Sequence, residues 1–107
     1  MTQLDIDVRR EGGADLILVS GPVNSYTFSE FQEKVYKSVL SSDTIVDMSK
    51  VSTLSSAGIG VLMAALDEAE AAGHRLAICR PSEIVSLALE STGFQERFPV
   101  IASPKDF

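Results

Sequence analysis

The sequence predicts a single α/β domain on a mainly parallel sheet of four or five strands. Short apolar segments alternate with amphipathic helical segments, which is the pattern of strands joined by crossover helices. The central apolar segments are continuous rather than alternating, as in parallel strands covered on both faces. The 107 residues suit one compact domain, 1–107, and are too few for two. The expected order is β-β-α-β-α-β-α-β, with an antiparallel strand at the N-terminal edge and helices packed on the sheet.

The first two strands are expected to form a hairpin. Residues 4–9 alternate apolar and charged side chains, which is typical of a half-exposed edge strand. Gly12–Gly13 supplies a turn, and residues 16–19 form a continuous apolar run. The edge strand could pair with a second copy, but its alternating charges argue against this. The sequence therefore leaves the oligomeric state open.

A helix is expected over 27–40, followed by a short buried strand over 44–48. The segment Thr27-Phe28-Ser29-Glu30 matches a capping box, in which a threonine hydroxyl and a glutamate satisfy the first amides of the helix. Phe28, Phe31, Val35 and Val39 then recur on one helical face. Residues 49–58 are small and polar, which predicts a loop.

The second half of the chain repeats the helix and strand alternation. A second helix of about 18 residues is expected to begin near Ser56 and to end at Gly73, a residue suited to a left-handed cap. A buried strand over 75–79 follows. The third helix is opened by Pro81-Ser82-Glu83, with Ile84, Leu87 and Ala88 as its apolar face, and it is closed by Thr92-Gly93. A short strand is expected over 98–101, and a loose tail over 102–107.

Composition excludes several classes of function. The net charge of −6 argues against nucleic acid as a direct partner, because phosphate binding needs clustered Lys and Arg. No apolar stretch approaches the roughly 20 residues that span a bilayer, and residues 1–12 are too charged for a signal peptide. Cys79 is the single cysteine and so forms no internal disulfide, and the sequence lacks the cluster of Cys and His residues that a zinc site needs. A cytoplasmic protein without cofactor, metal or membrane insertion is expected.

The candidate site is the sheet edge at the carboxyl ends of the strands, where functional groups gather in open α/β folds. Three loops are expected there, 21–26, 49–57 and 79–82. The middle loop places Ser55 and Ser56 at the amino end of a helix, where free amides and the helix dipole favour an anion. A phosphate on Ser56 would add about −1.5 to −2 charges. Plain helix capping by these serines is the simpler alternative.

Catalytic alternatives lack essential groups. Ser56 lies outside a G-x-S-x-G elbow, and the only histidine, His74, belongs to the far end of the same helix. Asp47 ends a strand and could accept a phosphoryl group, although a turn-forming aspartate is simpler, and no acidic cluster for Mg²⁺ accompanies it. Cys79 is expected to be a small core residue. No catalytic residue is therefore expected, and the protein is predicted not to be an enzyme.

The sequence resembles the STAS domain family, in particular the bacterial anti-sigma factor antagonists. Residues 45–51 (IVDMSKV) are similar to the family's D-x-S-x-V strand end, and residues 54–62 (LSSAGIGVL) to D-S-(S/T/A)-G-(L/I)-G-V-L at a helix start. Residues 20–24 (SGPVN) stand where the family often has G-E-L-D. Residues 84–94 resemble its terminal helix pattern, V-x-x-(L/I)-(L/F)-x-x-(S/T)-G-(L/F). The resemblance covers nearly the whole chain and the expected order of elements.

This resemblance implies partner switching. The unphosphorylated protein would bind an anti-sigma factor that is also a serine kinase, and so free a sigma factor. Phosphorylation, at Ser56 by alignment and at Ser55 as second choice, would end the binding, and a serine phosphatase would reset the switch. The implied partner-binding residues are Asn24, Ser25, Ser55, Ser56, Ala57, Gly58 and Ile59.

Two positions depart from the family pattern. Ser55 replaces the aspartate that precedes the phosphoacceptor, and Asn24 replaces the aspartate of G-E-L-D. Both replacements remove negative charge from the implied partner surface. They motivate an alternative, in which the chain is a STAS-type docking subunit of a transporter or stress-sensing complex without phospho-switching.

Overall fold

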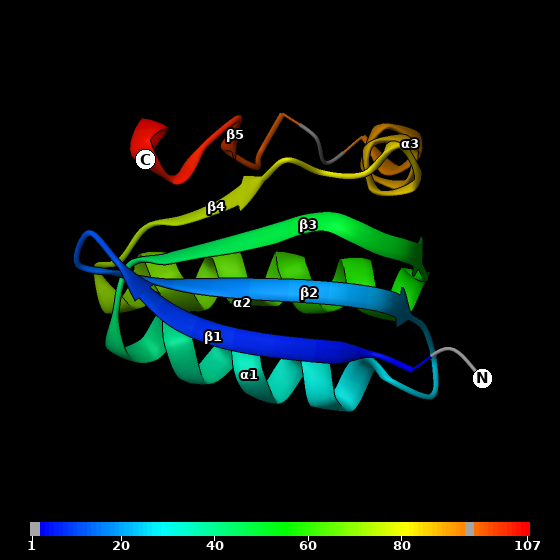
Figure 1. Cartoon of the computed structure of the whole chain (residues 1–107), viewed down its shortest axis with the longest axis horizontal. Helices are drawn as coiled ribbons and strands as arrows, with labels where there is room; N and C mark the ends of the chain where they lie inside the picture. The colour runs from blue at the N-terminus through cyan, green and yellow to red at the C-terminus, as the bar shows by residue number, and fades with distance from the viewer. Residues whose placement is uncertain (1–2, 94–95) are drawn as a thin grey trace.

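The computed structural model describes residues 3–93 and 96–107, and Figure 1 shows one α/β sheet with three α-helices. The elements follow the predicted order: β1 (Asp5–Glu11), β2 (Ala14–Val23), α1 (Phe28–Ser41), β3 (Thr44–Leu54), α2 (Ser56–Ala72), β4 (Leu76–Cys79), α3 (Glu83–Thr92), β5 (Val100–Ile101) and a 3₁₀ turn, η1 (Pro104–Asp106). The fold class predicted from the sequence is confirmed.

The five strands lie side by side in the order β1-β2-β3-β4-β5. β1 is antiparallel to β2, and each later neighbour is parallel, so the predicted antiparallel edge is confirmed. The hairpin turns through Gly12 and Gly13, whose φ angles of 58° and 86° are both positive. Two successive positive φ values define the tight turn whose twist matches that of paired strands, and glycine adopts them without strain.

The main core lies between the sheet and two helices, α1 and α2, which cover the same face (Figure 1). Its largest fully buried side chains include Ile17, Phe31, Met48, Leu62, Leu76 and Ile78. The opposite face holds a smaller cluster, of Ala14, Leu16, Ile45 and Cys79, which is covered by residues such as Ile101 and Phe107 rather than by α1 or α2. The continuous apolar runs therefore sit beneath helices on one face, whereas the other face remains partly open.

β3 is longer than the sequence predicts. It continues to Leu54, so the expected loop over 49–58 is wrong for residues 49–54. These residues keep pairing with β2, from Ser20 opposite Lys50 to Val23 opposite Leu54, with two irregularities in register. Val51 and Leu54 are buried, whereas the polar residues between them are exposed. The polar composition that suggests a loop reflects the exposed side of a strand that extends past β4.

The capping box predicted at Thr27 does not form. Thr27 is the N-cap of α1 by position, but its side chain makes no capping bond. Its hydroxyl instead donates to the carbonyl of Pro22 at 2.9 Å and accepts from the amide of Asn24 at 2.9 Å. Asn24 Oδ1 accepts from the amides of Tyr26 and Thr27, at 2.8 and 3.1 Å. The asparagine therefore organises this turn.

The predicted apolar face of α3 is wrong at Ile84 and Leu87, whereas Ala88 is half-buried against the core as expected. Val85 and Leu89 are buried, whereas Ile84 and Leu87 are 46% and 54% exposed. Ser82 sets this orientation, because its amide donates to the carbonyl of Met48 and its hydroxyl to that of Val51. Five of the six residues 84–89 are apolar, so the sequence alone offers more than one apolar face. The two Ser82 hydrogen bonds determine which of these residues face the sheet.

The C-terminal segment is ordered rather than loose. The expected strand over 98–101 is reduced to β5, Val100–Ile101, and Phe98 is buried beside it. Beyond β5 the chain forms η1, and the guanidinium of Arg75 lies 4.2 Å from the centre of the Phe107 ring. This cation–π contact and the packing of Phe107 against the smaller cluster hold a segment that its sequence predicts to be free.

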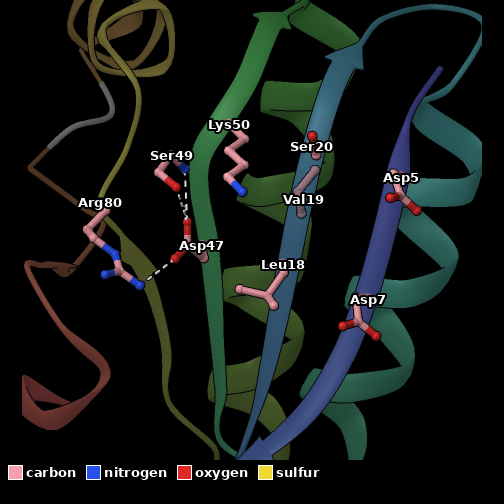
Figure 2. Close-up of a pocket in the computed structure, with 9 residues that line it drawn as sticks. All are labelled: Asp5, Asp7, Leu18, Val19, Ser20, Asp47, Ser49, Lys50 and Arg80. Carbon is pink, nitrogen blue, oxygen red and sulfur yellow. Dashed lines mark hydrogen bonds and ion pairs between the residues drawn. The ribbon is translucent and has the colours of Figure 1, made fainter. Parts of the chain in front are cut away.

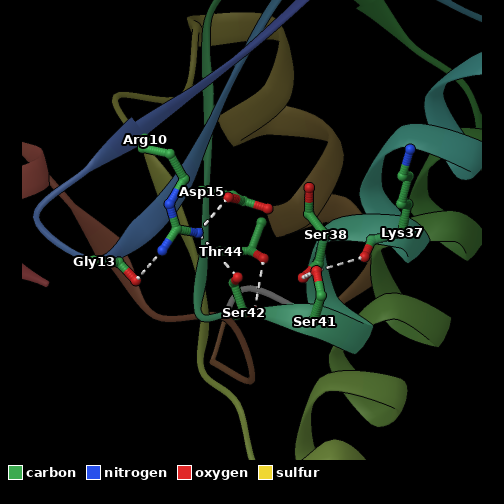
Figure 3. Close-up of polar contacts among 8 residues, drawn as sticks. All are labelled: Arg10, Gly13, Asp15, Lys37, Ser38, Ser41, Ser42 and Thr44. Atoms are coloured by element: carbon green, nitrogen blue, oxygen red, sulfur yellow. Dashed lines mark hydrogen bonds and ion pairs between the residues drawn. The ribbon is translucent and has the colours of Figure 1, made fainter.

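Polar contacts close the end of the sheet that lies away from the candidate site (Figure 3). The Arg10 guanidinium donates to Asp15 at 2.6 Å, to the Ser42 hydroxyl at 3.0 Å and to the Gly13 carbonyl at 3.1 Å. The Thr44 hydroxyl donates to the Ser42 carbonyl at 3.1 Å. One arginine thus joins the β1–β2 hairpin to the segment that connects α1 with β3.

Candidate functional site

The loops at the carboxyl ends of the parallel strands meet, as the sequence predicts. The amide of Ser55 donates to the carbonyl of Val23 at 2.9 Å, which ties the start of α2 to the end of β2. The Ser82 hydroxyl donates to the Val51 carbonyl at 2.8 Å and so ties the start of α3 to β3. These bonds hold the amino ends of two helices at one edge of the sheet.

Ser55 is the N-cap of α2. Its hydroxyl oxygen accepts from the Gly58 amide at 3.3 Å, and its carbonyl accepts from the Ile59 amide at 3.0 Å. The side chain is half-buried and already satisfies an amide that the helix cannot satisfy itself. The capping alternative from the sequence therefore applies to Ser55.

Ser56 occupies the first helical position and is exposed. The first four amides of a helix have no acceptor within the helix, and the dipole concentrates positive potential at this end. No acidic residue lies in the first turn of α2 to use that potential. The Ser56 hydroxyl therefore lies at the surface in a place that favours an added anion.

The residues that follow Ser56 form the packed base of the site. A Cβ atom on Gly58 would lie 2.7 Å from both Leu54 Cδ1 and Val23 Cγ1, so only glycine lets α2 approach β2 and β3 this closely. Ile59 is also buried. Among the predicted partner-binding residues, these two lie beneath the surface, so they would act on a partner by positioning the exposed serine.

The turn that follows β2 supplies the neighbouring surface. Ser25 is exposed, and Asn24 is half-buried by the bonds it makes within the turn. Tyr26 is 94% exposed, an unusual state for an aromatic side chain. Asn24 and Tyr26 line one side of a shallow hollow of about 520 Å³. Sequence reasoning missed Tyr26, although an aromatic residue in a polar turn outside the apolar pattern was the signal for it.

The structure separates Ser56 from the only histidine. His74 follows the C-terminal cap of α2, and its Nδ1 lies 2.7 Å from the Val39 carbonyl. α2 has 17 residues and is therefore about 25 Å long. A Ser–His pair needs contact at about 3 Å, so the prediction that these residues form no catalytic pair is confirmed.

Asp47 is engaged in a structural ion pair. Its carboxylate is buried and accepts from the Ser49 amide at 3.0 Å, the Ser49 hydroxyl at 2.7 Å and the Arg80 guanidinium at 2.8 Å (Figure 2). Burial alone would raise the pKa of Asp47, but these hydrogen bonds outweigh it and hold the pKa below its ordinary value. The carboxylate is therefore ionised and already accepts three hydrogen bonds, which favours the turn-forming aspartate over a phosphoacceptor.

Arg80 holds this pair from a strained backbone. Its φ of 49° is the one positive value among the non-glycine residues that the structure describes. The preceding residue, Cys79, is buried, and burial raises the pKa of its thiol. Cys79 therefore behaves as the core residue that the sequence predicts. Within residues 3–93 and 96–107, no three metal-ligating side chains gather at one place.

A separate hollow lies on the open face of the sheet. It has a volume of about 470 Å³, and its polar lining mixes both signs of charge (Figure 2): Asp5, Asp7, Asp47, Lys50 and Arg80. Sequence reasoning missed this group, because its members come from β1, from β3 and from the residue after β4. It belongs to the sheet face rather than to the edge that carries Ser56.

Comparison with known proteins supports one family over nearly the whole chain. Residues 5–106 match the family model described as STAS domain. The structure is similar to that of an anti-sigma factor antagonist from Mycobacterium paratuberculosis, with a TM-score of 0.87 at 20% identity, covering 97% of this chain and 90% of that one. It is also similar to the anti-sigma factor antagonist SpoIIAA in its unphosphorylated form, with a TM-score of 0.74 at 17% identity, covering 99% and 91%.

A further similar structure is that of the Bacillus cell fate determinant SpoIIAA in the phosphorylated form. Its TM-score is 0.69 at 16% identity, and the match covers 99% of this chain and 95% of that one. At these identities the structural likeness establishes the fold. Within the described residues, no helix is long and apolar enough to cross a membrane.

Proposed function

The chain belongs to the STAS domain family, and on that premise we propose that it is an anti-sigma factor antagonist that works by partner switching. In its unphosphorylated form it binds an anti-sigma factor that is also a serine kinase, and it thereby frees a sigma factor. Phosphorylation of Ser56 ends this binding, and a serine phosphatase restores it. The chain contributes the surface and the acceptor hydroxyl, while the kinase supplies the chemistry in the cytoplasm.

The observation that carries this proposal is the division of roles between the two serines. Ser55 is half-buried and caps α2, whereas Ser56 is exposed at the first helical position. A kinase can therefore reach Ser56 without breaking the cap. This supports Ser56 over Ser55 as the phosphoacceptor.

The electrostatics support loss of binding rather than loss of fold. A phosphate on Ser56 adds about −1.5 to −2 charges at the positive end of a helix, where the chain tolerates them. A partner docked over Ser56 and the Asn24 turn would have to bury those charges. Like-charge contacts and unpaired buried charges cost several kcal/mol at an interface, so the phosphate acts against the complex.

The replacement of the two family aspartates by Asn24 and Ser55 keeps the local backbone geometry possible. Asn24 Oδ1 accepts hydrogen bonds from two backbone amides of its turn, and the Ser55 hydroxyl caps α2. Asparagine, serine and aspartate are all effective acceptors at such positions, so the turns form without the charges. These replacements are therefore compatible with the same docking surface, now less acidic.

The proposal is tested by a pull-down from native cell extract, with wild type, Ser56→Asp and Ser86→Asp as baits. Ser86 is an exposed serine of α3, so its variant adds the same charge outside α2 and the Asn24 turn. We expect wild type and Ser86→Asp to retain a protein with an anti-sigma kinase domain, identified by mass spectrometry, and Ser56→Asp to lose it. Protein purified from the same cells should carry phosphate on Ser56.

Equal retention of the same partners by wild type and Ser56→Asp would contradict the switch. If those partners were transporter or stress-complex subunits, the chain would be a static STAS docking subunit. Phosphate on Ser55 in place of Ser56 would contradict the assignment of the acceptor. Retention of no kinase-type protein by any bait would contradict the function itself.

A further inference from the structure

β1 offers an uncovered edge to solvent. It pairs with β2 on one side, and it ends the sheet on the other. Six of its seven residues are exposed, including Val8 at 43%. Proteins usually protect such an edge with proline, a bulge or a very short strand. β1 has seven residues, contains no proline and pairs with β2 in unbroken register, so only its charges guard it.

The hairpin determines which backbone groups face outward. The turn places Glu11 and Ala14 opposite each other at its first and fourth positions. A tight turn of this kind closes with a hydrogen bond from the amide of its fourth residue to the carbonyl of its first. Along an antiparallel pair, alternate residues direct both backbone groups toward the partner strand. Glu11, Arg9 and Asp7 therefore face β2, and Arg10, Val8 and Ile6 present their amides and carbonyls to solvent. These three residues can form a ladder with another strand.

The alternating charges of β1, which the sequence alone suggests oppose pairing with a second copy, become complementary when two copies overlap fully. Two copies paired antiparallel about Val8 place Val8 opposite Val8, Ile6 opposite Arg10, and Asp7 of each copy opposite Arg9 of the other. The 7–9 pairs are not hydrogen-bonded pairs, so their side chains approach most closely. A shift about Asp7 keeps two attractive Asp5–Arg9 contacts, but it sets Asp7 against Asp7 and pairs only five residues of β1 instead of seven. A shift about Arg9 sets Arg9 against Arg9 and Asp7 against Glu11. The register about Val8 also sets Asp5 of each copy opposite Glu11 of the other, and these two like-charged pairs fall at the exposed ends of the ladder, where they cost little.

We propose that β1 is a self-association edge, through which two copies of this chain form a continuous sheet about a two-fold axis at Val8. Full overlap of the two strands favours this register, in which Asp7 and Arg9, which pair within one chain at 2.8 Å, pair between copies instead. The contact is isologous and therefore closes at two copies. It runs along the sheet edge and leaves the exposed hydroxyl of Ser56, at the start of α2, outside the ladder.

The test is sedimentation velocity on the full chain from about 1 μM to about 500 μM, a range that reveals dimers of micromolar affinity. We expect wild type to shift from monomer to dimer over this range. Asp7→Arg and Arg9→Asp each replace two attractive contacts by two repulsive ones, so each is expected to weaken self-association at least about tenfold. Glu33→Arg and Lys34→Asp on α1 make the same changes of net charge at exposed positions outside β1.

Mixing the two β1 variants makes the test specific. An equimolar mixture of Asp7→Arg and Arg9→Asp restores opposite charges across the ladder only between unlike chains, so a heterodimer is expected. In both variants the Asp7–Arg9 ion pair within one chain stays broken. If this pair only stabilised β1 locally, the mixture would therefore dimerise no better than either variant alone. The proposal is overturned if wild type stays monomeric over the whole concentration range, or if Asp7→Arg dimerises like wild type. It is also overturned if the mixture forms no heterodimer, or if the α1 controls weaken self-association equally.

Discussion

Replacing Gly58 by alanine tests whether the close approach of α2 to the sheet positions the candidate site. The added Cβ would lie 2.7 Å from Leu54 Cδ1 and from Val23 Cγ1, nearer than real Cβ contacts come. Val23 is fully buried and Leu54 is 8% exposed, so neither side chain has free space. α2 must therefore move away from β2 and β3, and Ser55 and Ser56 must move with it.

The magnitude follows from comparison with Gly60→Ala. A Cβ on Gly60 meets no atom within 4 Å, and this residue is exposed in the same helix. Alanine in a helix interior stabilises by roughly 0.5–1 kcal/mol relative to glycine, which is the effect expected for Gly60→Ala. Gly58→Ala gains the same stabilisation from helix propensity, but overpacking of its Cβ against Val23 and Leu54 destabilises the fold by about 1–3 kcal/mol. The difference between the two variants therefore isolates the contact at about 1–3 kcal/mol.

Thermal and urea unfolding of both variants and wild type measures this difference. For a domain of this size, 1 kcal/mol corresponds to about 4 °C in Tm. We expect Gly60→Ala to melt above wild type and Gly58→Ala to melt below it. If Gly58→Ala were as stable as Gly60→Ala, the close packing of α2 on Val23 and Leu54 would not constrain the helix, and the argument from the glycine would be refuted.

Two further predictions concern the site and the buried ion pair. Ser55→Ala should destabilise the fold by about 0.5–2 kcal/mol in urea unfolding, because it removes the cap of α2, whereas Ser56→Ala should change stability by less than about 0.5 kcal/mol; equal losses would contradict the division of roles. The lowered pKa of Asp47 means that its ion pair with Arg80 stabilises the fold above the unfolded pKa of about 3.9 and stops doing so as the pH falls through the lower folded pKa. Wild type should therefore exceed Asp47→Asn in stability by about 1.5–3 kcal/mol at pH 7, and the gap should narrow below about pH 4; a gap of constant size would show that the carboxylate charge contributes nothing.

The sequence predicts the order of elements well because hydrophobic periodicity reflects burial under α1 and α2. It fails where polar side chains belong to regular structure. Ser49, Lys50, Ser52 and Thr53 resemble a loop, yet they lie in β3, because that strand extends beyond β4 and exposes one side. A strand that is buried on one face normally shows alternating apolar and polar residues. Where a register irregularity interrupts this alternation, the sequence of such a strand cannot be distinguished from that of a loop.

Contacts between distant residues are the other part that the sequence does not show. Asp47 is recognisable as a strand-end aspartate, but its partner Arg80 lies 33 residues away and adopts a positive φ that local pattern does not predict. The predicted face of α3 is wrong at Ile84 and Leu87 because Ser82, bonded to β3, sets the helix rotation. The place of Ser55 and Ser56 was predictable because an N-cap is a local feature. Which of the two serines caps the helix depends on where the backbone becomes helical.

The uncharged caps at Asn24 and Ser55 have a consequence for the proposed switch. In a chain with aspartates at both places, a phosphate would join a surface that is already negative. Here Asn24 and Ser55 form their turns without charge, and the first turn of α2 holds no acidic residue. Phosphorylation of Ser56 would therefore change the charge of the surface formed by the start of α2 and the Asn24 turn from about zero to about −2. The state of that surface would depend on one hydroxyl, which makes Ser56→Asp the most informative substitution in the chain.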